Sequence, residues 1–170
     1  MKFLLASDIH GSAQWCRKLV EAIEAEAPDK IILLGDLLYH GPRNPLPFGH
    51  EPMEVADMLN ALKDRIIAVR GNCDAEVDQM VLDFPCMADY TIVTDGPTTI
   101  YCTHGHLYSP NDLPPIEPGT IFVSGHTHVQ VNDERDGIKI VNPGSTSLPK
   151  DGIHGYAIIT DGKIELKTLP

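Results

Sequence analysis

Short aliphatic runs alternate with amphipathic segments through the first part of the chain. The runs at residues 2–7, 30–34 and 65–69 have the length and composition of buried strands. Residues 13–27 repeat their apolar side chains at the spacing of one helix face, and a second helix is expected to start near Pro52. Strands that alternate with helices in this way favour a parallel sheet built from right-handed crossovers.

The second half of the chain has a different pattern, in which hairpin turns join several strand-like segments. Asp95-Gly96, Asp136-Gly137 and Asp161-Gly162 have the composition of two-residue hairpin turns. We therefore expect an α/β fold with two sheets packed together and helices outside, within one domain that spans residues 1–170. The strand-like segments lie at residues 90–94, 99–103, 120–124, 139–141, 156–160 and 163–168.

Polar clusters rich in glycine follow five of the expected strands. In open α/β sheets, ligands bind in the crevice beyond the carboxyl ends of the strands, so we expect the five clusters to converge. Glycine lets the backbone turn sharply and approach a ligand closely. The clusters are Ser7-Asp8-Ile9-His10-Gly11, Gly35-Asp36, Gly71-Asn72-Cys73-Asp74, Thr103-His104-Gly105-His106 and Gly125-His126-Thr127-His128.

The clusters combine carboxylates, an amide and imidazoles, which are costly to bury unless a partner compensates them. A divalent metal supplies that compensation, and mixed nitrogen and oxygen ligands suit Mn, Fe, Ni, Co or Zn. The four cysteines form no CxxC pair, which argues against a structural zinc site. Because a carboxylate can join two ions, Asp36, alone after its strand, is the natural candidate for a bridge.

Each cluster taken alone has an ordinary structural explanation. A single aspartate after a strand, such as Asp36, is more often a helix cap or turn residue than a ligand, and Gly71-Asn72 has the composition of a plain turn. His40 and His106 fit a metal ligand or a supporting position equally well. Only the coincidence of five clusters at strand ends favours a metal site.

Charge and hydropathy limit the partners. The chain has 13 Lys plus Arg against 24 Asp plus Glu, a net charge of −11, which repels the backbone of long nucleic acids. The longest unbroken apolar runs, such as residues 31–34, are far shorter than the ~20 residues of a membrane span, so no membrane partner is expected. We expect a cytoplasmic protein with reduced cysteines.

The five clusters together resemble the motifs of the calcineurin-like metallophosphoesterases, which follow one another as D-x-H, G-D, G-N-H-[DE], H and G-H-x-H. Residues 40–44 (HGPRN) and Cys73 in the third motif are most similar to a group of small bacterial phosphodiesterases within that family. The resemblance implies a metallo-dependent phosphatase-like fold, a four-layer α/β/β/α sandwich of two mixed sheets with a dinuclear metal centre.

Seven ligands are implied by the resemblance, with two divalent ions that are expected to be manganese. Such a centre hydrolyses small phosphodiesters by in-line attack of a hydroxide that bridges the metals, and Asp36, Asn72, Cys73 and His104 would be the catalytic residues. Asp8, His10 and His128 would bind one ion, Asn72, His104 and His126 the other, and Asp36 would bridge both.

The third motif departs from the family at Cys73, where other members have a histidine that protonates the leaving group. A thiol with an ordinary pKa near 8.5 is a poor substitute, so we expect a preference for diesters with good leaving groups. The alternative is that Cys73 only packs. Arg43 is a candidate contact to the substrate phosphate, because its guanidinium is a forked donor, although a surface loop arginine has the same sequence context.

Two other functions fit the same motifs. One is a non-catalytic scaffold or interaction protein of this fold, and the other is a phosphomonoesterase. Retention of all seven ligand positions favours an enzyme, and Cys73 favours diesters over monoesters. The protein could form homo-oligomers, and the proline-rich residues 108–119, between two ligand clusters, could shape the substrate entrance.

Overall fold

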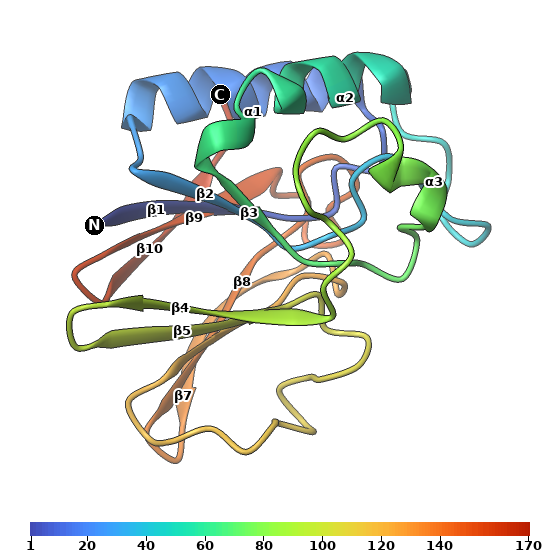
Figure 1. Cartoon of the computed structure of the whole chain (residues 1–170). Helices are drawn as coiled ribbons and strands as arrows, with labels where there is room; N and C mark the ends of the chain where they lie inside the picture. Colours follow the sequence, from blue (N-terminus) through green and yellow to red (C-terminus); the bar gives the residue numbers. More distant parts are fainter.

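The computed structural model describes all 170 residues and contains two five-stranded sheets (Figure 1). In the first sheet, β1, β2 and β3 are parallel, as the sequence predicts, whereas β9 pairs antiparallel with β1, and β10 pairs antiparallel with β9 at the edge. In spatial order its strands are β10 (Lys163–Thr168), β9 (Gly155–Thr160), β1 (Lys2–Ala6), β2 (Lys30–Leu33) and β3 (Ile66–Ala68).

The second sheet is also mixed. Its three central strands β5, β6 and β8 are parallel, and β4 and β7 pair with them in the antiparallel direction at the two edges. In spatial order the strands are β4 (Tyr90–Asp95), β5 (Thr98–Thr103), β6 (Ile121–Val123), β8 (Ile138–Pro143) and β7 (Gln130–Arg135).

The two long helices, α1 (Ala13–Glu26) and α2 (Pro52–Asn60), lie side by side over the first sheet (Figure 1). Ser12 caps the start of α1, because its hydroxyl accepts a hydrogen bond from the amide of Trp15. A short 3-10 helix (Lys63–Arg65) precedes β3, and the one-turn helix α3 (Glu76–Gln79) follows it. No helix is long and apolar enough to cross a bilayer.

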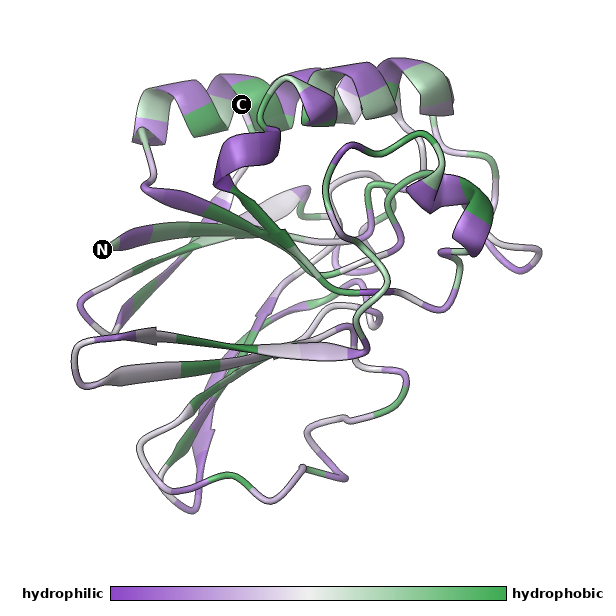
Figure 2. Cartoon of the chain, in the orientation of Figure 1, coloured by the Kyte–Doolittle hydropathy of each residue, from purple (hydrophilic) through white to green (hydrophobic).

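Alternating side chains of the central strands point to different apolar clusters. Leu4 of β1 and Ile31 of β2 pack beneath the helices, whereas Leu5 and Ile32 pack between the two sheets. Strands buried on both faces have to be apolar throughout, which explains why β1 and β2 are nearly continuous aliphatic runs. Figure 2 shows these hydrophobic strands beneath helices that are hydrophobic and hydrophilic in turn.

The predicted fold class, two mixed sheets in an α/β sandwich, is confirmed, but its outermost layer contains no helix. The outer face of the second sheet is covered instead by residues 108–119, whose Tyr108, Leu113 and Ile116 pack on a cluster that includes Phe122. None of residues 108–119 lines the cavity described below, so the structure does not support a role for this segment at the substrate entrance. Its apolar side chains are used to shield the sheet.

Candidate metal centre

The five polar clusters converge where the parallel strands of both sheets end. Asp8 and His10 follow β1, Asp36 follows β2, and Asn72 follows β3; His104 follows β5, and His126 and His128 follow β6. Because β1 to β3 run parallel in one sheet and β5 to β6 in the other, each sheet brings its carboxyl ends to one edge. Side chains from both sheets thus meet in one place.

One group of converging atoms comes from Asp8, His10 and His128, which are all almost completely buried. Oδ1 of Asp8 lies 3.1 Å from Nε2 of His128 and 3.6 Å from Nε2 of His10. Despite this proximity, Oδ1 of Asp8 forms no hydrogen bond. A buried carboxylate oxygen without a hydrogen bond is costly in a folded protein, and a bound cation would satisfy it.

A second group surrounds Nε2 of His104. Oδ1 of Asn72 lies 3.1 Å from this nitrogen, Nδ1 of His126 lies at 3.2 Å, and Oδ2 of Asp36 lies at 3.4 Å. Oδ2 of Asp36 is also 3.9 Å from Nε2 of His10. Asp36 thus stands between the two groups.

Backbone carbonyls fix the orientation of three of the imidazoles. Nδ1 of His10 lies 2.8 Å from the Tyr39 carbonyl oxygen, Nδ1 of His104 lies 2.6 Å from that of Leu34, and Nδ1 of His128 lies 2.7 Å from that of Leu148. A carbonyl oxygen only accepts hydrogen bonds, so in the neutral rings Nδ1 carries the proton and Nε2 presents a lone pair. Metal-binding histidines are commonly held in this way.

These lone pairs face one another across short distances. The Nε2 atoms of His10 and His128 are 3.2 Å apart, and Nε2 of His104 faces the amide oxygen of Asn72. Two lone pairs at this distance repel each other unless a positive charge lies between them. The donor set of imidazole nitrogens, carboxylates and one amide oxygen therefore fits divalent metal ions.

The pKa values show the same demand for positive charge. Burial raises the pKa of Asp8 and Asp36, yet the neighbouring imidazoles outweigh burial and hold the pKa of Asp36 below, and that of Asp8 well below, the ordinary value. Burial lowers the pKa of His104, but Asp36 and Asp8 outweigh it and raise that pKa to about 9. The two carboxylates thus favour positive charge in their surroundings.

Five of the polar residues have a backbone conformation that side chains rarely adopt. Asp8, His10, Asp36, His126 and His128 have φ angles between 51° and 67°, in the left-handed region. Such conformations persist only where the surrounding structure enforces them, and they concentrate at functional sites.

Close packing of the backbone enforces the position of Asp36. A Cβ atom on Gly71 would lie 2.0 Å from Oδ1 of Asp36, so only glycine fits there. The buried carboxylate of Asp74 accepts hydrogen bonds from the amides of Asp36, Leu37 and Gly71 and ties the second cluster to the third. The amide of Cys73 completes this link by donating to Oδ1 of Asp36.

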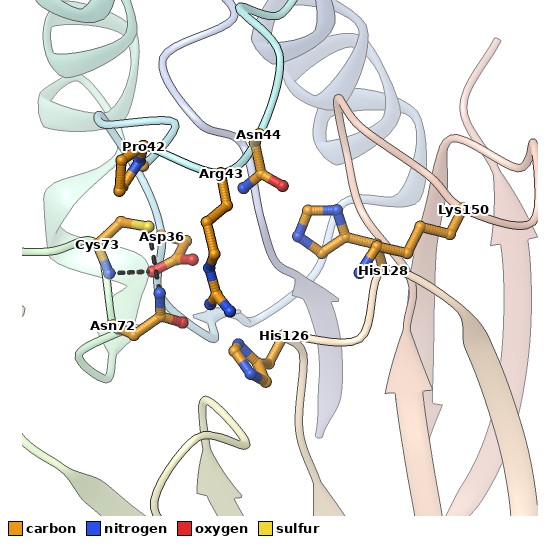
Figure 3. Close-up of a pocket in the computed structure, with 10 residues that line it drawn as sticks. Asp36, Pro42, Arg43, Asn44, Asn72, Cys73, His126, His128 and Lys150 are labelled. Atoms are coloured by element: carbon orange, nitrogen blue, oxygen red, sulfur yellow. Dashed lines mark hydrogen bonds between the residues drawn. The ribbon is translucent and has the colours of Figure 1, made fainter.

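A cavity of about 320 Å³ opens over the converging atoms (Figure 3). Asp36, Asn72, His126 and His128 line it from below, and the guanidinium of Arg43 extends between them. Lys150 also lines the cavity.

Neither Arg43 nor Lys150 forms an ion pair with a carboxylate. Arg43 was expected here from its sequence context, whereas Lys150 was not anticipated. Two unpaired cations beside a cluster of metal-ligand type suit an anionic ligand.

Cys73 lies at the edge of the cavity next to Asp36. Nδ2 of Asn72 is 3.3 Å from its sulfur, and Cys73, His10 and Asp36 each place one potential ligand atom within 4.8 Å of the others. Burial and the charge of Asp36 raise the pKa of the thiol to about 12. The thiol is therefore neutral at pH 7 and holds its proton tightly.

The two histidines with undecided roles lie beside the site. His106 packs edge-on against His104 with ring centroids 5.4 Å apart, and His40 packs edge-on against His50 at 5.3 Å. Neither belongs to a group of converging ligand atoms. A supporting position, one of the two alternatives, is what the structure favours for both.

Comparison with known proteins places these features in a family. The sequence matches the family described as calcineurin-like phosphoesterase superfamily domain over residues 1–163. Phosphodiesterase YfcE of Escherichia coli (strain K12) is 45% identical over 152 residues, which cover 89% of this chain and 83% of that protein. Phosphodiesterase MJ0936 of Methanocaldococcus jannaschii is 26% identical over 177 residues, which cover 99% of this chain and 98% of that protein.

The structures agree with the sequences. A solved structure of Yfce, described as a phosphoesterase from E. coli, matches the chain with a TM-score of 0.93, at 38% identity and with complete coverage of both chains. The predicted resemblance to small bacterial phosphodiesterases is confirmed.

Proposed function

Since the chain belongs to the calcineurin-like phosphoesterase superfamily, we propose that it is a metal-dependent phosphodiesterase that hydrolyses small phosphodiesters. The observation that carries this proposal is the set of lone pairs that face one another between the ends of the two sheets. Seven side chains contribute them. They are Asp8, His10, Asp36, Asn72, His104, His126 and His128.

The distances support a division of these ligands between two ions. The ligand atoms of Asp8, His10 and His128 lie close together, and so do those of Asn72, His104 and His126. Asp36 is within reach of both groups, which supports a bridging role. The bound ions supply Lewis acidity, which lowers the pKa of water and neutralises charge on phosphoryl oxygens.

The protein itself binds and orients the phosphodiester. Arg43 reaches over the ligand cluster and has a forked pair of donors that matches two phosphoryl oxygens (Figure 3). Lys150 adds a second positive charge from the opposite loop. In a chain of net charge −11, these two side chains make the cavity attractive to a phosphodiester anion.

The cavity supports a preference for good leaving groups. His126 and His128 are its only lining histidines, and both are proposed metal ligands, so no imidazole is left to protonate a leaving group. Cys73 holds its proton too tightly to replace one. A missing general acid commonly costs a factor of about 10² to 10⁴, which selects against poor leaving groups.

Manganese is the metal that we propose, because nitrogen and oxygen donors without a thiolate pair suit ions of this class. We also propose that residues 1–170 form one domain and that the protein is cytoplasmic. Its four unpaired cysteines are compatible with a reducing compartment. Homo-oligomerisation stays a prediction.

The proposal is tested by measuring metal content and hydrolysis together. After incubation with manganese and removal of free metal, the parent protein is expected to hold two ions per chain and to hydrolyse bis(4-nitrophenyl) phosphate faster than 4-nitrophenyl phosphate. Asp36→Asn is expected to hold fewer ions and to lose at least about 10³-fold in kcat/KM, because the proposed bridge loses its charge.

Asp136→Asn is the matched control, since Asp136 also has a left-handed backbone but is exposed in a hairpin turn. It is expected to keep both the metal and the rate. A parent protein that binds no manganese would support the scaffold alternative, and faster hydrolysis of the monoester would support a phosphomonoesterase. Hydrolysis by Asp36→Asn at the parent rate would refute the proposed centre.

A further inference from the structure

A second cavity adjoins the first. It has a volume of about 200 Å³ and shares Asn44, His128 and Lys150 with the cavity over the proposed metal centre. Beyond these shared residues it is lined by Pro45 on one side and by Leu148 and Pro149 on the other. The two cavities together form a groove that leads away from Cys73 and Asp36 toward an apolar end.

Both walls of the groove are anchored to proposed metal ligands. The segment that ends in Asn44 and Pro45 begins at Tyr39, whose carbonyl oxygen accepts the hydrogen bond of His10. On the opposite wall, the Leu148 carbonyl oxygen accepts the hydrogen bond of His128, and the amide of Lys150 donates to the His128 carbonyl oxygen at 2.9 Å. These hydrogen bonds tie the segments that form both walls to proposed metal ligands.

The chemistry of the groove changes along its length. Lys150 stands where the two cavities join, and the rings of Pro45 and Pro149 and the side chain of Leu148 form the apolar end. In an in-line displacement, the two free phosphoryl oxygens and the retained ester oxygen share the equatorial plane around phosphorus. A cation that holds a phosphoryl oxygen therefore lies beside the retained substituent.

We propose that the apolar end of this groove, formed by Pro45, Leu148 and Pro149, binds the retained organic substituent of the phosphodiester and favours a single aromatic ring there. The inference rests on the proposed function and adds a substrate class to it. An engineered apolar cavity of about 150 Å³ holds one benzene molecule, so about 200 Å³ suits one ring and is short for a longer group.

The test compares two substrates that release the same leaving group. Phenyl 4-nitrophenyl phosphate and methyl 4-nitrophenyl phosphate both release 4-nitrophenolate, and only the retained substituent differs. The manganese-loaded parent is expected to prefer the phenyl substrate through a lower KM. Leu148→Ala removes the apolar wall but keeps the carbonyl that holds His128, and it is expected to reduce the phenyl-to-methyl ratio of kcat/KM about fivefold.

Two further variants keep the test decisive. Leu113→Ala removes a half-buried leucine from the outer face of the second sheet, and it is expected to leave the ratio unchanged. If Leu148→Ala does not fold, Pro45→Ala tests the opposite wall and is expected to lower the ratio in the same direction.

An equal preference of the parent for both substrates, or an unchanged ratio in the wall variants, would overturn the subsite. Neither outcome would affect the proposed hydrolysis, because the methyl substrate would still be cleaved. Failure of the parent to hydrolyse either substrate would instead refute the proposed function itself.

Discussion

The two ends of the sheets use the same unusual backbone conformation for opposite purposes. Asp8 and Asp36, at the carboxyl ends of β1 and β2, have φ angles of 55° and 54°, and Asp136 and Asp161, in hairpin turns, have φ angles of 51° and 50°. Asp136 and Asp161 are exposed and are followed by glycine, as two-residue hairpin turns require. Asp8 and Asp36 are buried.

The difference lies in solvation, since the conformational cost is similar at both ends. An exposed carboxylate in a turn keeps its water, whereas a buried one needs compensation from nearby positive charge. At the buried end, backbone amides donate one hydrogen bond to each carboxylate, and the other neighbours are imidazoles whose lone pairs also require a cation. A left-handed aspartate is therefore informative about function only when its burial is known.

Glycine substitutions give the largest expected contrast between the two ends. Gly71→Ala places a Cβ atom against Oδ1 of Asp36, and it is expected to cost about 3 kcal/mol in the free energy of unfolding. A displaced Asp36 is also expected to lower kcat/KM about 10²-fold. Gly96→Ala, in the Asp95-Gly96 turn, meets no atom within 4 Å and is expected to cost about 1 kcal/mol from its positive φ alone.

Urea unfolding and diester hydrolysis of the two variants measure this contrast. A loss of stability in Gly71→Ala that is no larger than the loss in Gly96→Ala would show that the close approach to Asp36 adds little to the cost at Gly71. Full activity in Gly71→Ala would contradict the proposed position of Asp36 in the centre.

Replacement of Cys73 by histidine is expected to have a smaller effect on activity. An imidazole at this position restores a proton donor, and kcat/KM for diesters with poor leaving groups is expected to rise about tenfold. The gain is limited because Gly41 lies close to the thiol and leaves little room for a larger side chain. A Cβ atom on Gly41 would lie only 2.8 Å from Sγ of Cys73.

A series of aryl methyl phosphates of increasing leaving-group pKa provides the measurement. Cys73→His is expected to show a weaker dependence on leaving-group pKa than the parent, whereas the control Cys73→Ser keeps the dependence of the parent. An unchanged dependence in Cys73→His would mean that this position does not face the leaving group.

The pH dependence of stability is the smallest of the expected effects. In the metal-free protein, burial lowers the pKa of His104, but Asp36 and Asp8 outweigh the effect of burial. They raise this pKa to about 9, above the unfolded value of about 6.5. The stabilisation from the charged ring is thus complete below pH 6.5 and is lost as the pH rises through 9. Metal binding displaces these protons, so manganese affinity is expected to increase over the same range.

Urea midpoints of the chelator-treated protein between pH 6.5 and 9 test the effect. The midpoint is expected to fall with pH in the parent and to fall less in His104→Asn. A constant midpoint in the parent would contradict the demand for positive charge at the buried end.

Most of the site was predictable because its residues follow strands that the sequence reveals by their aliphatic composition. Because the carboxyl ends of parallel strands lie at the same edge of a sheet, the clusters around Asp8, Asp36 and His104 could be expected to meet. The roles of His40 and His106 could not be decided, because the direction of an imidazole depends on tertiary packing. Asp74 acts through three backbone amides, which no local pattern reveals.

The elements that escaped prediction are those without an apolar pattern. β7 is a polar edge strand, QVNDER, with mostly exposed side chains, so its sequence lacks the alternation of a half-buried strand. The turn at Asp136-Gly137 was the available signal, since a hairpin before β8 requires a strand on its other side. Lys150 was missed because it follows a loop and not a strand.

Leu148 divides two tasks between its backbone and its side chain. Its carbonyl group orients His128, and every amino acid has such a main-chain carbonyl. Its side chain lines the groove, so a change in its size or polarity alters the groove without removing the carbonyl. Evolution can therefore change which compounds the protein accepts, one substitution at a time, without disturbing the reactive centre that the main chain holds in place.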